Sequence, residues 1–137
     1  MTAVLTVYSD GGARGNPGPA AIGFLVLSEK GEVIKTGSYC LGLRTNNQAE
    51  YEALIAALEF AVRSNSKEVH CYLDSELVVK HLTGEFRVKN PALRKLWNRV
   101  QELKNCFKKV SFKNVPRTNE FIRKVDKMVN DSLDVGV

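Results

Sequence analysis

Several residue types and patterns are scarce in this chain of 137 residues. It contains two histidines, one tryptophan and no Cys-x-x-Cys pair, and its three cysteines lie in unrelated contexts: Cys40, Cys71 and Cys106. No apolar run approaches the roughly 18 residues that cross a bilayer, and no basic and apolar leader opens the chain. These gaps argue against zinc-binding, secreted, disulfide-rich and membrane-spanning proteins. We therefore expect a cytoplasmic protein with reduced, mostly buried thiols.

The overall composition is that of a globular protein. Hydrophobic residues make up 44% of the chain and charged residues 26%, and the length suits one domain covering residues 1–137. Repeats, low-complexity stretches and linkers are absent from the sequence. No feature marks an oligomer interface, so we expect a monomer.

The net charge of +5 is unevenly distributed along the chain. Residues 1–84 hold seven Lys/Arg and nine Asp/Glu, whereas residues 85–127 hold thirteen and four. A basic second half is what a polyanion-binding face requires, although a lysine-rich solvated surface has the same composition. Charge alone leaves both interpretations open.

Periodicity and capping signals divide the chain into nine segments. Strand-like alternation is found at residues 3–10, 20–28, 33–41, 68–74 and 109–115. Helical patterns with start signals are found at residues 45–65, 75–82, 90–106 and 119–133. The glycine- and proline-rich residues 11–19 are predicted to form a loop, which lacks the Gly-Lys-Ser/Thr of a nucleotide-binding loop. The order predicts an α/β domain, with one mixed sheet and helices on both faces.

Glu50 is out of place on the first long helix. The apolar stripe of this helix includes Ala53, Leu54, Ala57 and Leu58, and its projection toward the helix start reaches Glu50. A carboxylate on a face that should be buried is costly unless a cation meets it. Glu50 is therefore predicted to have a cationic partner.

Two aspartates end strand-like segments, Asp10 after the first and Asp74 after the fourth. A right-handed helical crossover would place these strands side by side and parallel, with the chain leaving in opposite directions. Open α/β sheets bind ligands at such a switch point. One strand-end aspartate is commonly a turn residue, but two at the same switch point predict a site.

The last helix repeats the anomaly of the first, because Asp126 shares a stripe with Ile122, Val129 and Leu133. Four carboxylates close together would repel one another, and a divalent cation would relieve the repulsion. Oxygen ligands favour Mg²⁺ or Mn²⁺. The four predicted ligands are Asp10, Glu50, Asp74 and Asp126.

These motifs give the sequence a strong resemblance to type 1 ribonuclease H. The matching segments are Tyr8-Ser9-Asp10-Gly11-Gly12, Gly15-Asn16-Pro17-Gly18, Thr45-Asn46-Asn47-Gln48-Ala49-Glu50 and Asp74-Ser75, with a looser match at Val115-Pro116-Arg117 before Asp126. They occur in the family's order and cover nearly the whole chain. The resemblance implies a five-stranded sheet of order 3-2-1-4-5. It also implies hydrolysis of the RNA strand of RNA–DNA hybrids, leaving 5′-phosphate and 3′-hydroxyl ends.

The resemblance also implies roles for individual residues. The four carboxylates match the family's catalytic ligands for two metal ions, which would flank the scissile phosphate. Residues implied to contact the hybrid are Gly11, Gly12, Asn16, Thr45, Asn46, Asn47, Ser75 and Arg117. For Asn46 and Asn47 helix capping competes with substrate contact, although the two roles are compatible, and for Asn16 the alternative is a turn before Pro17.

The sequence departs from the family pattern in three places. Arg117 stands in the loop where many members have a histidine, and both histidines, His70 and His81, lie in elements where a structural role is expected. Where the family has the motif Asn-x-x-Ala-Asp, this sequence has Ile-Arg-Lys-Val-Asp at residues 122–126. Residues 83–90 are too short for the extra helix and basic protrusion of longer members. Substrate grip would then fall to Arg87, Lys89, Arg94, Lys95 and their neighbours.

Two other functions remain compatible with this sequence. One is another nuclease or strand-transfer core on the same fold, although such integrase-type cores usually carry their glutamate late in the chain rather than about forty residues after the first aspartate. The other is a non-catalytic hybrid-binding module, which predicts the loss of a carboxylate, whereas all four are present.

Overall fold

The computed structural model describes residues 3–136 and contains one five-stranded sheet and four helices. The strands are β1 (Val4–Ala13), β2 (Gly18–Leu27), β3 (Val33–Arg44), β4 (Glu68–Leu73) and β5 (Lys109–Asn114). The helices are α1 (Asn46–Arg63), α2 (Glu76–Leu82), α3 (Pro91–Lys104) and α4 (Glu120–Val135). All nine predicted segments are present, and most boundaries agree within two or three residues. No helix in the described part of the chain is long and apolar enough to span a membrane.

The sheet has the predicted order β3-β2-β1-β4-β5. β1, β2 and β3 form an antiparallel meander, whereas β4 lies parallel to both β1 and β5. The parallel pairing of β1 and β4 runs from Val4 opposite Glu68 to Tyr8 opposite Tyr72. The switch point inferred from the sequence is therefore present between β1 and β4.

The predicted loop at residues 11–19 is too long. β1 continues to Ala13 and β2 starts at Gly18, because Gly11, Gly12 and Ala13 keep the antiparallel register opposite Ile22, Ala21 and Ala20. Only residues 14–17 connect the two strands. Asp10 is consequently an interior residue of β1 and not its last one. It lies two residues beyond the last parallel pair with β4.

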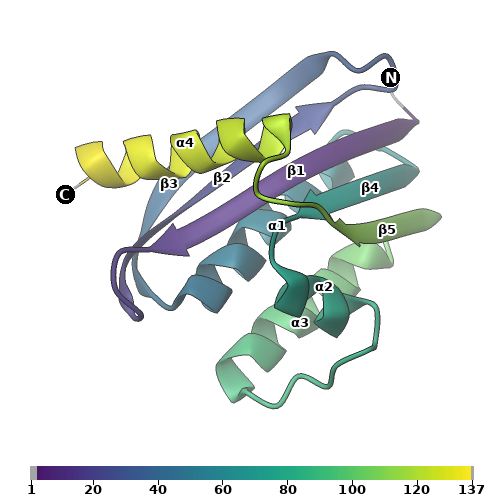
Figure 1. Ribbon diagram of the computed structural model, residues 1–137. Coiled ribbons are helices and arrows are strands. Elements are labelled where there is room, and N and C mark those ends of the chain that lie inside the picture. The colour runs from purple at the N-terminus through teal and green to yellow at the C-terminus, as the bar shows by residue number, and fades with distance from the viewer. Residues whose placement is uncertain (1–2, 137) are drawn as a thin grey trace.

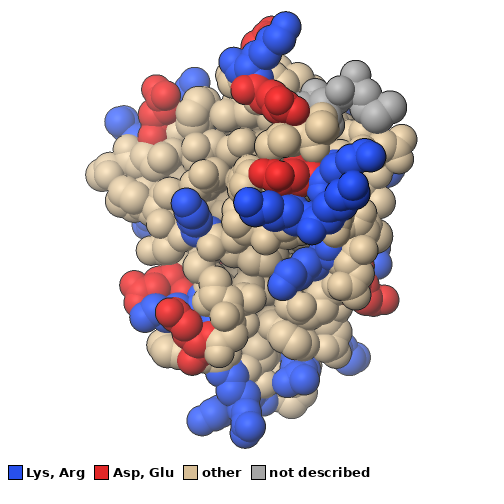
Figure 2. All heavy atoms as spheres, turned by 90° about the vertical axis from the view of Figure 1, so that its right-hand side faces the viewer, with Lys and Arg blue, Asp and Glu red and all other residues tan. Residues whose placement is uncertain are grey.

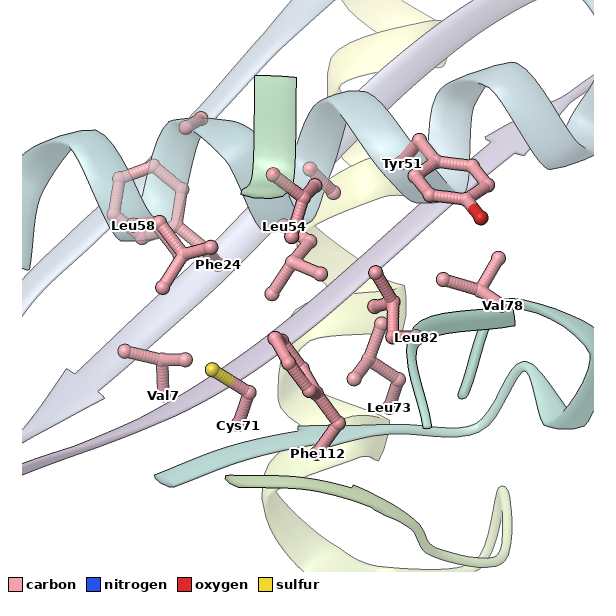
Figure 3. Close-up of a cluster of buried hydrophobic side chains, with 14 of the residues drawn as sticks. Val7, Phe24, Tyr51, Leu54, Leu58, Cys71, Leu73, Val78, Leu82 and Phe112 are labelled. Atoms are coloured by element: carbon pink, nitrogen blue, oxygen red, sulfur yellow. The ribbon is translucent and has the colours of Figure 1, made fainter. Parts of the chain in front are cut away.

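Helices cover the two faces of the sheet unequally (Figure 1). α1 packs on β1 and β2 with α3 beside it, and α4 lies across β1, β2 and β3 on the opposite face. The larger hydrophobic core lies on the α1 side. Figure 3 shows Leu54 and Leu58 of α1 pointing toward side chains of the sheet, among them Val7, Cys71 and Phe112. Each such fully buried side chain contributes about 1.5–3 kcal/mol of hydrophobic stabilisation.

The start of α1 is fixed by a reciprocal capping box. The Thr45 hydroxyl accepts a hydrogen bond from the Gln48 backbone N–H, and the Gln48 side chain accepts one from the Thr45 backbone N–H. Two backbone donors that a helix start leaves unpaired are thereby satisfied, for roughly 1 kcal/mol. The first turn of α1 is thus held rigidly next to the sheet.

His81 has the structural role expected from the sequence. Buried His81 is hydrogen-bonded through Nδ1 to the Tyr51 hydroxyl at 2.8 Å, and its carbonyl accepts from the Trp97 indole N–H at 3.2 Å. This one residue of α2 therefore ties α2 to α1 and α3. Burial lowers the pKa of His81, which favours the neutral ring.

The expectation of mostly buried thiols is wrong. Cys71 is buried in the core, but Cys40 and Cys106 are exposed. Cys40 lies on the edge strand β3, where its Sγ donates to the Ser132 carbonyl of α4, and Cys106 follows the last turn of α3. All three are free.

The contact between β1 and α1 is made by main-chain atoms at Gly11. A Cβ at this position would lie 2.1 Å from the Ala49 carbonyl oxygen. We expect Gly11→Ala to push α1 away from β1 and to lower the free energy of unfolding by about 1–3 kcal/mol. Urea denaturation followed by circular dichroism would measure the change.

Gly12→Ala is the matched control for this substitution. A Cβ on Gly12 would meet its nearest heavy atom, Val129 Cγ1, at 3.9 Å, an ordinary contact. Its free energy of unfolding should equal or slightly exceed that of the wild type. Equal stability of the two alanine variants would contradict the close approach at Gly11.

Candidate active site

Three carboxylates from three elements meet at the switch point. Asp10 projects from β1, Glu50 from the second turn of α1, and Asp74 directly follows β4. One oxygen from each lies within 4.8 Å of the other two. Asp10 and Glu50 are buried and Asp74 is half-buried. The structure brings together these three side chains, which were predicted from the sequence to share one site.

A main-chain hydrogen bond fixes the position of Glu50. Its Oε1 accepts from the Gly11 backbone N–H at 2.7 Å, within a buried contact. Gly11 follows Asp10, so the chain segment that carries one carboxylate also orients the other. The cluster geometry depends on the backbone contact between β1 and α1 described above.

The metal-free cluster holds protons more tightly than ordinary carboxyl groups do. Burial raises the pKa of Asp10 to about 7, and repulsion from Asp74 adds to the effect. Burial also raises the pKa of Glu50 well above its usual value, with repulsion from Asp10 and Asp74 adding and the Gly11 N–H opposing. Asp10 and Glu50 therefore keep their protons to a higher pH than ordinary carboxyl groups do.

Asp126 lies at the margin of the cluster. The buried stripe of α4 consists of Ile122, Val125, Val129 and Leu133, so the predicted stripe through Asp126 is wrong by one position. Asp126 is half-buried beside Val125, lines the same cleft and adds to the rise in the pKa of Asp10. It does not belong to the three-carboxylate group whose oxygens lie within 4.8 Å of one another.

Arg117 reaches the cluster from the loop between β5 and α4. Its Nε lies 3.2 Å from Asp74 Oδ2, while the arginine side chain is 81% exposed. Such an exposed guanidinium is free to move, and the pair gains little stability. Arg117 thus supplies the site with a mobile positive charge.

Several polar residues around the cleft also hold backbone groups in place. Asn46 Oδ1 accepts from the Ala13 N–H at 2.8 Å, and Asn16 Oδ1 accepts from the Asn46 N–H at 3.0 Å. Ser75 caps α2 through the Val78 N–H at 3.3 Å. Among the described residues no hydrogen bond uses the side-chain NH₂ group of Asn46 or the side chain of Asn47, so both are available to a ligand.

A cleft of about 410 Å³ unites these groups. From the predicted set it is lined by Asp10, Gly11, Gly12, Asn46, Asn47, Glu50, Asp74, Ser75, Arg117 and Asp126. Asn16 and Thr45 are set back from it: Asn16 holds the Asn46 backbone, and Thr45 caps α1. The geometry thus brings most predicted site residues to one surface.

Two polar residues of the cleft were missed in the sequence. Asn130 donates from Nδ2 to the Asp126 carbonyl at 3.1 Å and to Asp126 Oδ2 at 3.4 Å. Its spacing of four residues after Asp126 on a helix was a usable signal. Arg14 lines the cleft and pairs with Asp134 at 2.6 Å, a contact across 120 residues that no local pattern reveals.

The basic residues of the second half are divided between two ends of the sheet. Figure 2 shows Lys and Arg side chains over the face where β1, β4 and β5 begin, which is the end opposite the carboxylates. The connections before β4 and β5 meet there through bonds to the Lys67 carbonyl. Basic residues near this end are Lys67 and Lys108 in the connections and Arg63 and Lys104 at the ends of α1 and α3. The net charge of residues 85–127 therefore does not by itself mark the substrate face.

A second groove lies beside the start of α1, the helix that carries Glu50. It runs between the start of α1 and the start of α3 and is lined by Arg44, Gln48, Glu52, Pro91, Ala92, Lys95 and Leu96. Arg44 forms an ion pair with Glu52 at 2.8 Å, whereas Lys95 forms none with the residues that the structure describes. Of the four cations expected to grip the substrate, Lys95 lines this groove, and Arg94 stacks over Trp97 on the same helix.

The donor set suits a hard divalent cation. The ligand atoms of the three-carboxylate group are all oxygens, which Mg²⁺ and Mn²⁺ prefer. The group contains neither of the two histidines. A cation there would offset both the desolvation and the mutual repulsion that raise the pKa values. The residues present therefore fit a magnesium or manganese site.

Comparison with known sequences gives a consistent family. A family model described as reverse transcriptase-like matches residues 8–132. Ribonuclease HI of Halobacterium salinarum is 44% identical over 128 residues, which cover 93% of this chain and 63% of the relative. The bifunctional protein Rv2228c of Mycobacterium tuberculosis is 37% identical over 133 residues, 96% of this chain and 36% of that protein. The chain thus spans less than two thirds of the length of these curated relatives.

Solved structures agree in fold over nearly the whole chain. The crystal structure of the Halobacterium salinarum RNase H1 superposes with a TM-score of 0.91 at 41% identity, covering 96% of this chain and 98% of that one. LC11-RNase H1, solved in complex with an RNA/DNA hybrid, superposes with a TM-score of 0.88 at 37% identity, covering 96% and 98%. On these sequence and structural matches, the chain belongs to the type 1 ribonuclease H family.

Proposed function

We propose that this protein hydrolyses the RNA strand of RNA–DNA hybrids, leaving 5′-phosphate and 3′-hydroxyl ends. One observation carries the proposal: Asp10, Glu50 and Asp74 bring their oxygens within 4.8 Å of one another in a cleft of a ribonuclease H fold. We take residues 1–137 as one catalytic domain that acts as a monomer. The relative LC11-RNase H1, solved with an RNA/DNA hybrid, supports this choice of substrate.

The four carboxylates are proposed to hold the metal. Asp10, Glu50 and Asp74 would be the principal ligands, and Asp126, at the margin of the cleft, would join them when substrate is present. When bound there, two Mg²⁺ or Mn²⁺ ions would supply activation of the attacking water and stabilisation of the leaving oxygen. The protein's contribution is to hold buried carboxylates in a fixed arrangement through the Gly11 N–H.

The polar groups next to Glu50 are proposed to recognise the ribose. Asn46 and Asn47 line the cleft, and amide groups can both donate to and accept from a 2′-hydroxyl. Asn16 and Thr45 would act by fixing the backbone that presents them. Backbone groups of Gly11 and Gly12 and the hydroxyl of Ser75 complete this polar surface. A DNA strand lacks the 2′-hydroxyl, which explains a preference for the RNA strand.

The groove between α1 and α3 is proposed to hold the complementary DNA strand. It adjoins the Thr45–Gln48 turn and presents Arg44 and Lys95. Phosphate contacts by such residues position a duplex without reading its sequence. The protein would therefore bind hybrids of any sequence.

Arg117 is proposed to exchange Asp74 for a substrate phosphate. An arginine cannot act as a general base, because its guanidinium stays protonated. In the structure it partly neutralises Asp74, and a metal bound there would release the guanidinium. The exposed side chain could then contact the charge that develops on the phosphate.

Cleavage of matched substrates tests the proposed activity. We expect labelled RNA–DNA hybrid to be cut with Mg²⁺ or Mn²⁺, and duplex DNA to survive, with end analysis showing 5′-phosphate products. Asp10→Asn should lower the cleavage rate at least a hundredfold, because it removes a charge from the metal site. Asp131→Asn, which removes an exposed carboxylate paired with Lys127, should leave the rate unchanged.

The outcome separates the three candidate functions. Cutting of duplex DNA while the hybrid survives would indicate the other nuclease class. Tight binding of the hybrid without cleavage at any metal concentration would indicate a binding module. Unimpaired hybrid cleavage by Asp10→Asn would remove the carboxylate cluster from the mechanism.

Substitution of Arg117 tests its part in the reaction. Arg117→Ala should lower kcat by about tenfold to a hundredfold, because a charged hydrogen bond to the phosphate is lost. Arg117→Lys should have an intermediate kcat, since it keeps the charge but not the guanidinium fork. Single-turnover cleavage measures both. Arg63→Ala, at the far end of α1, is the control, and a normal kcat for Arg117→Ala would refute the role.

The raised pKa values predict how metal-free stability depends on pH. Between about pH 5 and pH 8 the folded state binds more protons at Asp10 and Glu50 than the unfolded chain does, so stability should fall as pH rises. Asp10→Asn should raise the free energy of unfolding by about 2 kcal/mol at pH 8 and far less at pH 5. Thermal denaturation in a chelator would measure this, with Asp131→Asn as control.

Metal binding should offset the loss of stability that ionisation of Asp10 and Glu50 causes. Mg²⁺ should raise Tm more at pH 8 than at pH 5, because the carboxylates must be ionised to bind it. Ca²⁺ should also raise Tm, without supporting cleavage. Absence of any shift with either ion at pH 8 would contradict a preformed carboxylate cluster.

A further inference from the structure

One part of the sheet lacks a covering helix. α4 packs on β1, β2 and β3, and Figure 1 shows β4 and β5 running past it with no helix over them on that face. Because side chains alternate along a strand, the residues on this face are those opposite the buried positions of β4 and β5. They form three cross-strand pairs: Glu68 with Lys109, His70 with Ser111, and Tyr72 with Lys113.

Aromatic rings form a row along this face. Tyr8 stacks on Tyr72 with ring centroids 5.1 Å apart and an interplanar angle of 19°. Phe121 of α4 lies on the other side of Tyr8, at 4.9 Å. β4 lies between β1 and β5, so the second face of the half-buried Tyr72 ring is turned toward Lys113 on β5. Within residues 3–136 the row therefore ends at Tyr72, whose ring stacks on Tyr8 and on no further aromatic ring.

The charges around the row favour an anion. Lys109, Lys113 and Lys124 are exposed, and none makes an ion pair within residues 3–136. Of the two acidic residues nearby, Glu68 is held at 2.5 Å by His70, whose other ring nitrogen lies 2.6 Å from the Ser111 hydroxyl. Glu120, in the first turn of α4, is the other; burial raises the pKa of the Tyr8 phenol, and Tyr72 and then Glu120 add to that rise. Along this face Lys109, Lys113 and Lys124 thus outnumber Glu68 and Glu120, and Lys124 also lies over the Phe121 ring at 5.4 Å from its centroid.

This face is continuous with the carboxylate cleft. Tyr72 precedes Asp74 by two residues and Tyr8 precedes Asp10 by two, so the rings lie about 7 Å along the strands from the two carboxylates and on the same side of the sheet. Arg117, which borders the cleft, directly follows β5 and its turn. A strand leaving the cleft past Asp74 and Arg117 would meet Tyr72 next.

We propose that the face formed by Tyr72, Ser111, Lys109 and Lys113 binds an unpaired stretch of nucleic acid that extends from the strand in the cleft. An unpaired base would stack on the open side of Tyr72, and the lysines would contact its phosphates. A duplex would not use the ring, because its bases are already stacked on one another. The inference rests on the proposed function and adds a preference for hybrids that carry a single-stranded extension.

Hybrids with and without an extension test this preference. The duplex is kept identical, and a short single-stranded RNA extension is added at the 5′ end, at the 3′ end or at neither. For the wild type, kcat/KM should be severalfold higher with one of the extended hybrids than with the blunt one. Tyr72→Leu and Lys113→Gln should bring this ratio close to one.

Matched controls come from β3 and from the turn before it. Tyr39→Leu replaces an exposed tyrosine of the same sheet, and Lys30→Gln replaces a lysine in the turn before β3. Both should keep the wild-type ratio. A ratio of one in the wild type, or a wild-type ratio in Tyr72→Leu and Lys113→Gln, would overturn the proposal.

A binding measurement separates this proposal from the proposed hybrid cleavage. Fluorescence anisotropy of a labelled single-stranded RNA, in a chelator, needs no cleavage and no metal. Kd should rise on the order of tenfold in Tyr72→Leu and stay unchanged in Tyr39→Leu. Failure to cut any hybrid would refute the proposed function alone, whereas equal Kd for wild type and Tyr72→Leu would refute the single-strand site alone.

Discussion

The main-chain contact between Gly11 and Ala49 is the constraint on which the site depends. With no side chain between them, the first turns of α1 lie against β1, and the Gly11 N–H donates directly to Glu50. The same contact removes the carboxylates from water and so creates their mutual penalty. The fixed positions of the carboxylates and their mutual repulsion thus have the same origin. A divalent cation would offset the repulsion, and the fixed positions would hold its ligands in place.

The sequence was sufficient to find the carboxylates because each stood against a regular pattern. Glu50 interrupted the apolar stripe of α1, and Asp10 and Asp74 lay near the ends of two strands that a right-handed crossover makes parallel. The resemblance to ribonuclease H then specified the strand order, which the structure confirms. Asp126 was predicted from a stripe that in the structure passes through Val125 instead, and Asp126 itself is half-buried at the margin of the cleft.

Other features could not be predicted because they depend on long-range contacts. The extension of β1 through Gly11 and Gly12 depends on pairing with β2, which overrides the usual preference of glycine for loops. The Arg117–Asp74 and Arg14–Asp134 pairs join residues 43 and 120 positions apart. The division of basic residues between the two ends of the sheet likewise follows from where α3 starts and ends.

Anchoring through backbone atoms also separates two properties that mutation often changes together. Side chains such as Leu54 and Leu58 stabilise α1 against the sheet, but they do not set the distance between Glu50 and Asp10. Substitutions in that core can therefore alter thermal resistance while the ligand geometry is kept. Core substitutions could thus change the thermal stability of the protein without moving the carboxylates of the site.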